Sequence, residues 1–352
     1  MAPVNPKGLA FYNNLVNELL KNGITPIATL FHWDLPQALQ DKYGGWLSDK
    51  IVADFAHYAY VVFDSLADRV HMWITMNEPG NFRSKAYRFG DYPPGRCSDR
   101  AICAEGNSST EPWICGHNSL KAHAAAVNIY RTEFQSKYPG QIGIILDNTW
   151  TEPLNPLSKA DQDAAERTMQ FFVGLYAQPI WIGDYPPTMR QSMGSIIPTF
   201  TPTQLELIKG SVDFFAWDAY TSQWVTPLSD PTCLQNVSGQ NVSKTCRRSH
   251  HLGSMSEAWA EGIPLKGYIY WSCMDNFEWN DGGSTAGFGT VRVDYSTKQR
   301  MLKRSAYFLR DWFDCKRLFY NIIIETKLLW RNWLARLTVN QEVGGSSPPR
   351  SA

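Results

Sequence analysis

Glu78 stands at the end of a predicted buried strand, a place suited to acid–base chemistry. Apolar and polar side chains alternate over residues 70–77, and Pro79 follows Glu78 directly. A carboxyl group at the mouth of a strand can donate a proton to a bound molecule or accept one from it. The alternative is an ordinary strand-end residue in a solvated turn, because so short a motif has little specificity by itself.

Polar side chains also end an earlier apolar run. Residues 24–31 predict a short strand, and His32, Trp33 and Asp34 come directly after it. A single histidine in such a place is more often a core residue than a binding residue. The elements around the two strands therefore decide between these interpretations.

Helices and strands alternate along most of the chain. Asn5 can cap the first helix, and Pro6 suits its first position. Such alternation, with polar residues at strand C-termini, is typical of a parallel α/β fold, and a (β/α)8 barrel carries its chemistry at that end. Five strands are predicted, whereas a closed barrel needs eight. We predict helices over residues 6–22, 49–66, 116–138, 160–176 and 252–261, a further helix starting at residues 201–202, strands over residues 24–31, 69–79, 141–146, 212–217 and 265–274, and a loop over residues 80–112.

Length and charge limit the class of protein. With 352 residues, the chain is long enough for one large α/β domain or two smaller ones. Its 33 lysines and arginines balance 33 aspartates and glutamates, so we expect no nucleic-acid partner. No stretch approaches the roughly 20 apolar residues of a membrane span, so we expect a soluble protein. The 14 tryptophans, 16 tyrosines and 17 phenylalanines suit either a core or a cleft in which rings stack on sugars.

The seven cysteines are scattered and predict no metal site. Cys97, Cys103 and Cys115 share one polar loop, which allows a local disulfide, and Cys233 and Cys246 bracket another. No pair has a zinc-type spacing, so we expect reduced or locally bridged cysteines, without a metal ion or other cofactor.

Cellular location is open between the cytoplasm and secretion. Sequons of the N-x-S type begin at Asn107, Asn236 and Asn241, but they matter only in a secretory context. No signal peptide is recognisable, and the start of the chain also looks incomplete.

Four motifs occur in order along the chain. They are F-H-W-D-L-P-Q at residues 31–37, Y-G-G-W at 43–46, T-M-N-E-P at 75–79 and W-S-C-M-D-N-F-E-W at 271–279. Together they resemble the signatures of glycoside hydrolase family 1, the β-glucosidase family, over roughly residues 4–313. The resemblance implies a (β/α)8 barrel and a retaining mechanism, in which an acid/base and a nucleophile lie roughly 5 to 5.5 Å apart around the anomeric carbon.

The resemblance assigns roles to the residues at the first two strand ends. Glu78 matches the acid/base, and Asn77 matches the asparagine that binds the sugar 2-hydroxyl. His32 and Trp33 match residues that bind the hydroxyls of the glycone, the sugar that is released. In family 1 sites the charge of the nucleophile raises the pKa of the acid, so that it is protonated before the bond breaks.

Further matches lie in the second half of the chain. Trp271 resembles the tryptophan under the sugar, and Glu278 and Trp279 resemble the pair that holds the O4 and O6 hydroxyls. Tyr220 stands where the family has a tyrosine that hydrogen-bonds the nucleophile. The preceding residues 218–219 are Asp-Ala, which departs from the usual Asn-Tyr.

The nucleophile itself is missing. A motif resembling Ile-Thr-Glu-Asn-Gly is expected within residues 221–267, and it is not there. We interpret this as an internal deletion near residues 247–251 that removes strand seven with its glutamate. Glu257 and Glu261 fall in the predicted helix that follows, and Glu325 lacks the Asn-Gly turn, so none is a good substitute.

Both ends of the chain also depart from the family pattern. The chain opens at the helix that normally follows strands one and two, so strands one, two and seven are expected to be missing, which leaves five. We therefore expect a partial barrel over residues 1–313. Residues 314–352 are expected to be a non-family tail, disordered or mistranslated.

The sequence thus predicts a β-glucosidase-like retaining hydrolase whose partner is a small β-glycoside or oligosaccharide. Without the nucleophile, this chain is expected to have little or no activity, because covalent catalysis is lost. The alternatives are a non-catalytic sugar-binding pseudoenzyme and a fragment that does not fold stably. An open sheet would leave unpaired strand edges and favour aggregation.

Overall fold

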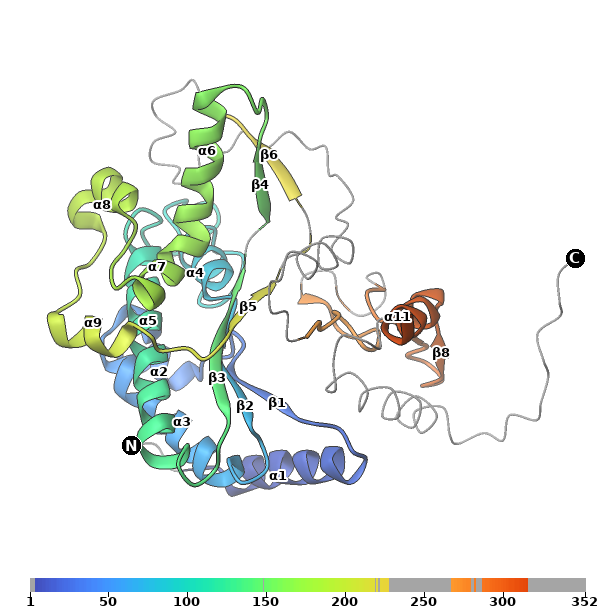
Figure 1. The fold of residues 1–352 in the computed structure, drawn as a ribbon. Helices are drawn as coiled ribbons and strands as arrows, with labels where there is room; N and C mark the ends of the chain where they lie inside the picture. The colour runs from blue at the N-terminus through green and yellow to red at the C-terminus, as the bar shows by residue number, and fades with distance from the viewer. Residues whose placement is uncertain are drawn as a thin grey trace, which may run out of the picture. The chain divides into compact units, whose positions relative to one another are not determined.

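The computed structural model describes residues 4–315 except 148, 219, 221, 228–266, 280–281 and 283–286. The chain divides into two compact units, the first comprising Met1–Val16 with Pro26–His250 and the second Asn17–Thr25 with His251–Ala352. Figure 1 shows their elements along the chain. Each unit is described by itself.

The first unit is built on a parallel sheet of four strands. The order is β1 (Ile27–Phe31), β2 (Met72–Asn77), β3 (Gln141–Asp147) and β5 (Phe215–Asp218), and all neighbours are parallel. Each new strand joins the edge left by the one before, as repeated β/α units require. The carboxyl ends of all four strands therefore meet at one edge of the sheet.

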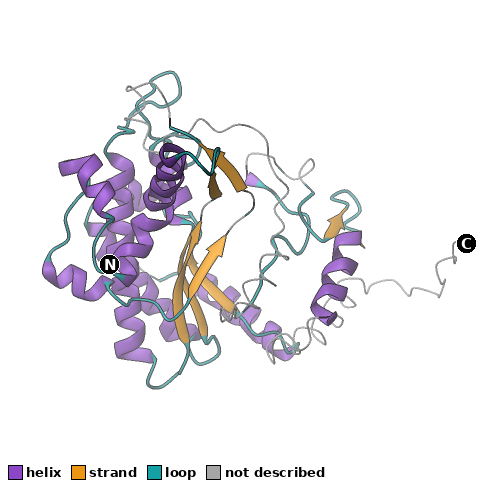
Figure 2. Ribbon diagram, turned by 45° about the horizontal axis from the view of Figure 1, so that its top comes forward, coloured by secondary structure: helices purple, strands orange, loops and turns teal. Residues whose placement is uncertain are grey.

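Helices connect these strands and lie mainly on one side of them (Figures 1 and 2). A further strand pair, β4 with β6, is parallel, while β7 and β8 in the second unit pair antiparallel. The remaining elements are α1 (Pro6–Lys21), α2 (Gln37–Tyr43), a 3-10 turn (Gly45–Leu47), α3 (Lys50–Leu66), α4 (Pro79–Tyr87), α5 (Glu111–Ile129), a π-turn (Tyr130–Phe134), β4 (Trp150–Pro153), α6 (Lys159–Met169), a π-turn (Gln170–Gly174), α7 (Leu175–Trp181), α8 (Pro187–Met193), a 3-10 turn (Gly194–Ile196), α9 (Pro202–Ile208), β6 (Ser222–Val225), β7 (Val291–Val293), β8 (Arg300–Leu302) and α11 (Arg304–Cys315).

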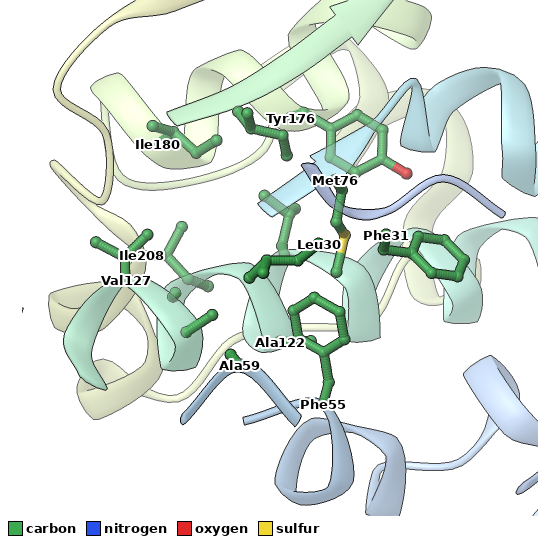
Figure 3. Close-up of a cluster of buried hydrophobic side chains, with 14 of the residues drawn as sticks. Leu30, Phe31, Phe55, Ala59, Met76, Ala122, Val127, Tyr176, Ile180 and Ile208 are labelled. Carbon is green, nitrogen blue, oxygen red and sulfur yellow. The ribbon is translucent and has the colours of Figure 1, made fainter. Parts of the chain in front are cut away.

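The core of the first unit fills the space between the sheet and α3 and α5 (Figure 3). Leu30 and Met76 from the strands lie near Phe55 of α3 and Ala122 of α5, and all four side chains are buried. Burying such side chains stabilises the fold by roughly 1.5 to 3 kcal/mol for each large one. Because helices cover the sheet, even the polar members of β2 are buried, and Thr75 hydrogen-bonds His123 of α5 at 2.7 Å.

Several predicted boundaries are confirmed by their caps. Asn5 Oδ1 accepts hydrogen bonds from the backbone N–H groups of Lys7 and Gly8 at the start of α1. Thr201 and Gln204 form a reciprocal capping box at α9. Such side chains satisfy N–H groups that the first helical turn leaves unpaired.

Three predictions differ from the structure. The predicted loop over residues 80–112 contains α4, because Pro79 suits a first helical position and tertiary packing buries most of the helix. The helix predicted over residues 160–176 is α6, a π-turn and the first residues of α7. Residues 267–274 make only an isolated bridge, Met274 to Val291, where the fifth strand was predicted. The predicted helix over residues 252–261, the deletion near 247–251 and residues 316–352 of the tail lie outside the described residues.

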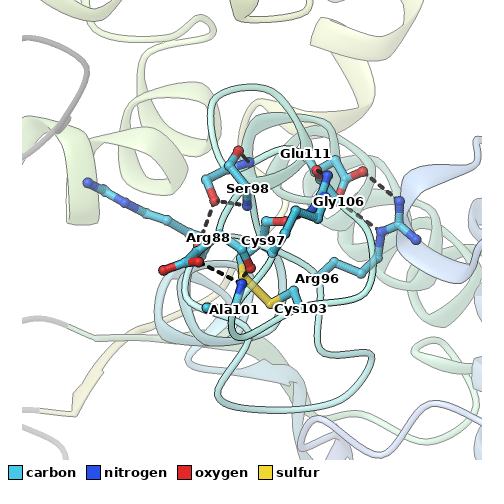
Figure 4. The surroundings of a disulfide bond; sticks show 11 residues. Arg88, Arg96, Cys97, Ser98, Ala101, Cys103, Gly106 and Glu111 are labelled. Atoms are coloured by element: carbon cyan, nitrogen blue, oxygen red, sulfur yellow. Dashed lines mark hydrogen bonds and ion pairs between the residues drawn. A yellow bond between two sulfur atoms is a disulfide. The ribbon is translucent and has the colours of Figure 1, made fainter.

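A disulfide joins Cys97 and Cys103, as the sequence allowed (Figure 4). The adjacent Arg96 forms a two-pronged ion pair with Glu111, at 2.9 and 2.7 Å, and so ties this loop to the start of α5. Cys115 is a buried free cysteine on α5, and Cys233 and Cys246 lie outside the described residues. No helix in the described part of the chain is both long and apolar enough to cross a membrane.

Candidate active site

Glu78 lies between β2 and α4 and is the single residue that turns the strand into the helix. Its backbone is left-handed, with φ of 46° and ψ of 55°. Two hydrogen bonds fix it: the Glu78 N–H donates to Ile145 O at 3.0 Å, and Glu78 O accepts from the Phe82 N–H at 2.9 Å. A left-handed residue other than glycine costs on the order of 1 to 3 kcal/mol, and such strain is concentrated at functional sites.

The same backbone signature marks other predicted site residues. Among the described residues other than glycine, positive φ occurs at Trp33, Glu78, Trp279 and Lys298. Three of these four were predicted to bind substrate or transfer protons, which favours a functional explanation over an ordinary turn.

His32, Trp33 and Asn77 gather beside Glu78 at the carboxyl ends of β1 and β2. The Asn77 amide nitrogen lies 3.3 Å from His32 Nε2, and the Trp33 indole N–H donates to Asn77 O at 2.9 Å. Burial lowers the pKa of His32, although the charge of Glu78 acts in the opposite direction. A neutral imidazole can accept from Asn77 and hydrogen-bond sugar hydroxyls. The structure thus brings these four predicted residues together.

Two aspartates missed as site residues lie at the next two strand ends. Asp147 ends β3 and Asp218 ends β5, and the two are Cα partners in the sheet register. Asn81 links this pair to Glu78, since its backbone N–H donates to Asp147 Oδ1 at 3.2 Å and its side-chain amide donates to Glu78 Oε2 at 3.0 Å. The signal that identified Glu78, a polar residue directly after a strand, was also present for Asp147.

The two aspartates are held in an environment that favours their protonated forms. Burial, assisted by the charge of Glu78, raises the pKa of Asp147 to about 7. Burial and a hydrogen bond with Glu78 raise the pKa of Asp218 to about 8. Desolvation and neighbouring like charge both disfavour a carboxylate. The edge of the sheet therefore holds protons near neutral pH.

Tyr220 follows Asp218 by two residues and is 58% exposed. Its predicted contact is with a nucleophile that the sequence lacks. The role of Tyr220 therefore stays a prediction.

In the second unit, Trp271, Glu278 and Trp279 form a cluster of their own. The Trp271 indole N–H donates to both oxygens of Glu278, at 3.0 and 3.2 Å, and the Asn276 amide donates to Glu278 Oε1 at 2.9 Å. Glu278 is buried, whereas the rings of Trp271 and Trp279 are 44% and 42% exposed. This arrangement fixes a carboxylate beside two accessible aromatic rings, and Asn276 is a member that the sequence did not indicate.

Comparison with known proteins identifies relatives of the whole arrangement. The family model described as Glycosyl hydrolase family 1 matches residues 1–250 and 247–318. Beta-glucosidase 1B of Phanerodontia chrysosporium is 36% identical over 375 residues, which cover 88% of this chain and 69% of that protein.

Solved structures agree. A rice β-glucosidase, Os3BGlu6, superposes with a TM-score of 0.82 at 32% identity, covering 88% of this chain and 80% of that one. A β-glucosidase from the fungus Humicola insolens, in complex with glucose, gives a TM-score of 0.80 at 33% identity, covering 89% and 80%. The predicted fold class is confirmed: the parallel sheet and its crossover helices are part of a (β/α)8-barrel fold.

Proposed function

Because this chain belongs to glycosyl hydrolase family 1, we propose that its strand-end cluster is a β-glycoside site with Glu78 as the general acid/base. The observation that carries the proposal is the position of Glu78. It is buried at the end of β2, with its backbone fixed in a left-handed conformation and with His32, Trp33 and Asn77 around it. The substrate class is a small β-glucoside or a related oligosaccharide.

The acid step uses residues of the first unit. Protonated Glu78 gives its proton to the glycosidic oxygen as the bond to the anomeric carbon breaks, and the leaving group departs as an alcohol. Asn77 and His32 offer a donor and an acceptor to sugar hydroxyls. Trp33 holds the Asn77 backbone through its indole N–H, so it orients the amide that is proposed to bind the 2-hydroxyl.

The second unit supplies further sugar-binding groups. Glu278 is held by Trp271 and Asn276. Its carboxylate has further lone pairs, which can accept from the O4 and O6 hydroxyls. The exposed rings of Trp271 and Trp279 suit stacking on the apolar face of a pyranose.

We propose that the chain turns over substrate weakly or not at all, because the sequence contains no nucleophile motif. The family match in two segments, which meet at residues 247–250, supports an internal deletion near residues 247–251. It also supports a family-derived part over residues 1–313, followed by a non-family tail. Asp218 does not replace the nucleophile, because a carboxyl hydrogen-bonded to Glu78 leaves no room for an anomeric carbon between the two.

The test is hydrolysis of an aryl β-glucoside by the purified full chain, with and without azide. Without azide we expect no turnover above that of Glu78→Gln. With azide, the anion attacks the anomeric carbon, the aglycone leaves with the proton of Glu78, and an α-glycosyl azide forms. Turnover without azide would refute the proposed inactivity, and azide-dependent product that is equal in Glu78→Gln would refute the role of Glu78.

A second candidate function is a non-catalytic sugar-binding protein. It is favoured by the ordered hydrogen bonds among the sugar-binding side chains in a chain without a nucleophile motif. Calorimetry with a glucose-like inhibitor distinguishes it, since binding heat without azide-dependent turnover supports this function. Absence of both heat and a cooperative unfolding transition would instead indicate a chain that does not fold stably.

A further inference from the structure

Three carboxyl groups meet at the carboxyl edge of the parallel sheet. They come from three adjacent strands: Glu78 follows β2, Asp147 ends β3 and Asp218 ends β5. Glu78 is tied to β3 by the hydrogen bond from its N–H to Ile145 O at 3.0 Å. The sheet register therefore fixes the positions of all three.

The three groups are joined by hydrogen bonds as well as by position. Asn81 donates to Asp147 through its backbone and to Glu78 through its side chain. The side chains of Asp218 and Glu78 hydrogen-bond each other directly. Two ionised carboxylates are both acceptors only, so this direct contact requires a proton on one of them.

The surrounding charges do not remove the need for that proton. Arg83 of α4 is buried and contributes positive charge near Asp147, while its guanidinium lies over the Trp113 ring at 4.6 Å and donates to Phe171 O at 3.0 Å. His32, after β1, faces Glu78, but burial favours its neutral form. A single guanidinium thus stands against three carboxyls.

Asp147 differs from Asp218 in its partners. It accepts backbone N–H groups of Gly80 and Asn81 at the start of α4, where a carboxylate is favoured by the helix dipole. Gly80 permits this approach, since a Cβ there would lie only 3.1 Å from Asp147 Oδ1. Asp147 therefore serves the helix, whereas Asp218 has Glu78 as its carboxyl partner.

We propose that Glu78 and Asp218 share one proton, and that Asp218 is a positioning residue that keeps the acid protonated where no nucleophile charge is available to do so. This inference rests on the proposed role of Glu78. Like charge in direct contact makes the second proton of such a pair hard to remove. On donation, the proton passes from Glu78 to the glycosidic oxygen, and the pair remains as two carboxylates until it takes a proton from water.

The test is the infrared C=O band of protonated carboxyl groups, followed against pH on the full chain. In the wild type we expect a component that persists through neutral pH. Asp218→Asn should remove it, because the new amide donates to the Glu78 carboxylate and lets it ionise at least about 2 pH units lower. Glu78→Gln should remove the same component from the other side, because Asp218 then loses its like-charged partner.

Two matched variants control for the loss of any buried carboxyl. Asp161→Asn removes a buried carboxyl that accepts from the Asn155 N–H at 2.8 Å and the Thr226 hydroxyl at 2.9 Å, away from the site. Asp147→Asn removes the third member of the cluster. Both should leave the Glu78–Asp218 component in place.

The proposal is overturned if Asp218→Asn, with a wild-type near-UV circular dichroism spectrum, titrates as the wild type does through neutral pH. If Asp218→Asn does not fold, Glu78→Gln decides in the same way. The measurement needs neither turnover nor sugar. Failure of the hydrolysis test therefore leaves this result readable, and a failure here leaves the azide result unaffected.

Discussion

Replacing Asp147 by asparagine should make the protein more stable at neutral and alkaline pH. Asp147 is buried, and its carboxyl faces Glu78 and Asp218. The structure holds this group in a place that suits the site at the expense of stability, a common compromise at functional positions. Asparagine has nearly the same shape and keeps an oxygen that can accept from the Asn81 N–H.

The size of the effect follows from the pKa. Burial raises the pKa of Asp147 from 3.8 to about 7, and a difference of this size corresponds to about 4 kcal/mol. The unfolded chain loses this proton near pH 3.8, while the folded chain keeps it until about pH 7. The folded state binds more protons in between, so the stability of the wild type falls as pH rises through that window and is lowest above it.

The assay is urea denaturation of wild type and Asp147→Asn between pH 4 and pH 8. We expect nearly equal free energies of unfolding at pH 4 and an advantage for the variant that approaches about 4 kcal/mol at pH 8. Asp161→Asn is the control, since Asp161 is equally buried but accepts two hydrogen bonds, and its replacement should destabilise. If Asp147→Asn is less stable than the wild type at pH 8, the assignment of a strained, proton-holding carboxyl is wrong.

Three further predictions concern other parts of the molecule. Burial lowers the pKa of His123 to about 3, so the unfolded state gains a proton first as pH falls below 6.5, and stability should decline by up to about 1.4 kcal/mol per pH unit down to about pH 3; His123→Gln should flatten this decline in urea titrations, whereas replacing the exposed His71 should not. Replacing Cys97 and Cys103 by serine should lower the free energy of unfolding by about 2 kcal/mol, and a reducing agent should have this effect on the wild type alone. Glu278→Gln should weaken binding of a glucose-like inhibitor about tenfold in calorimetry, whereas Glu152→Gln, which alters a similar tryptophan–glutamate pair at Trp150, should leave binding unchanged.

The strands and the acid could be predicted because their signals are local. β2 is an uninterrupted apolar run with polar residues at its end, and Pro79 marks the change to another element. The helix that follows was missed, since residues 80–90 are rich in glycine and charge and show little amphipathic pattern. Its stability comes from tertiary contacts, such as the Tyr176 hydroxyl that donates to Pro79 O at 3.0 Å.

The rest of the site depends on distances between strands that sequence patterns do not contain. Asp147 and Asp218 are separated by 71 positions in the chain and become Cα partners only through the register of β3 and β5. A sequence reading noted Asp218 as a departure from the family and found no role for its charge. The contact with Glu78 gives it one that asparagine at that position would not have.

The acid half of this site is encoded by a continuous part of the chain. β1, β2, β3 and β5 lie within residues 27–218 and build their shared edge from repeated β/α units. A deletion near residues 247–251 would remove the nucleophile without altering the register that fixes Glu78. It would also remove the negative charge that keeps the acid protonated in family 1 sites. Asp218, on the adjoining strand, restores a like charge at hydrogen-bonding distance, so the geometry of proton donation and the means of holding the proton come from the same sheet. Azide-dependent turnover that falls in Asp218→Asn at neutral pH but recovers at acidic pH would separate this electrostatic role from a structural one, because a structural defect would reduce turnover at both.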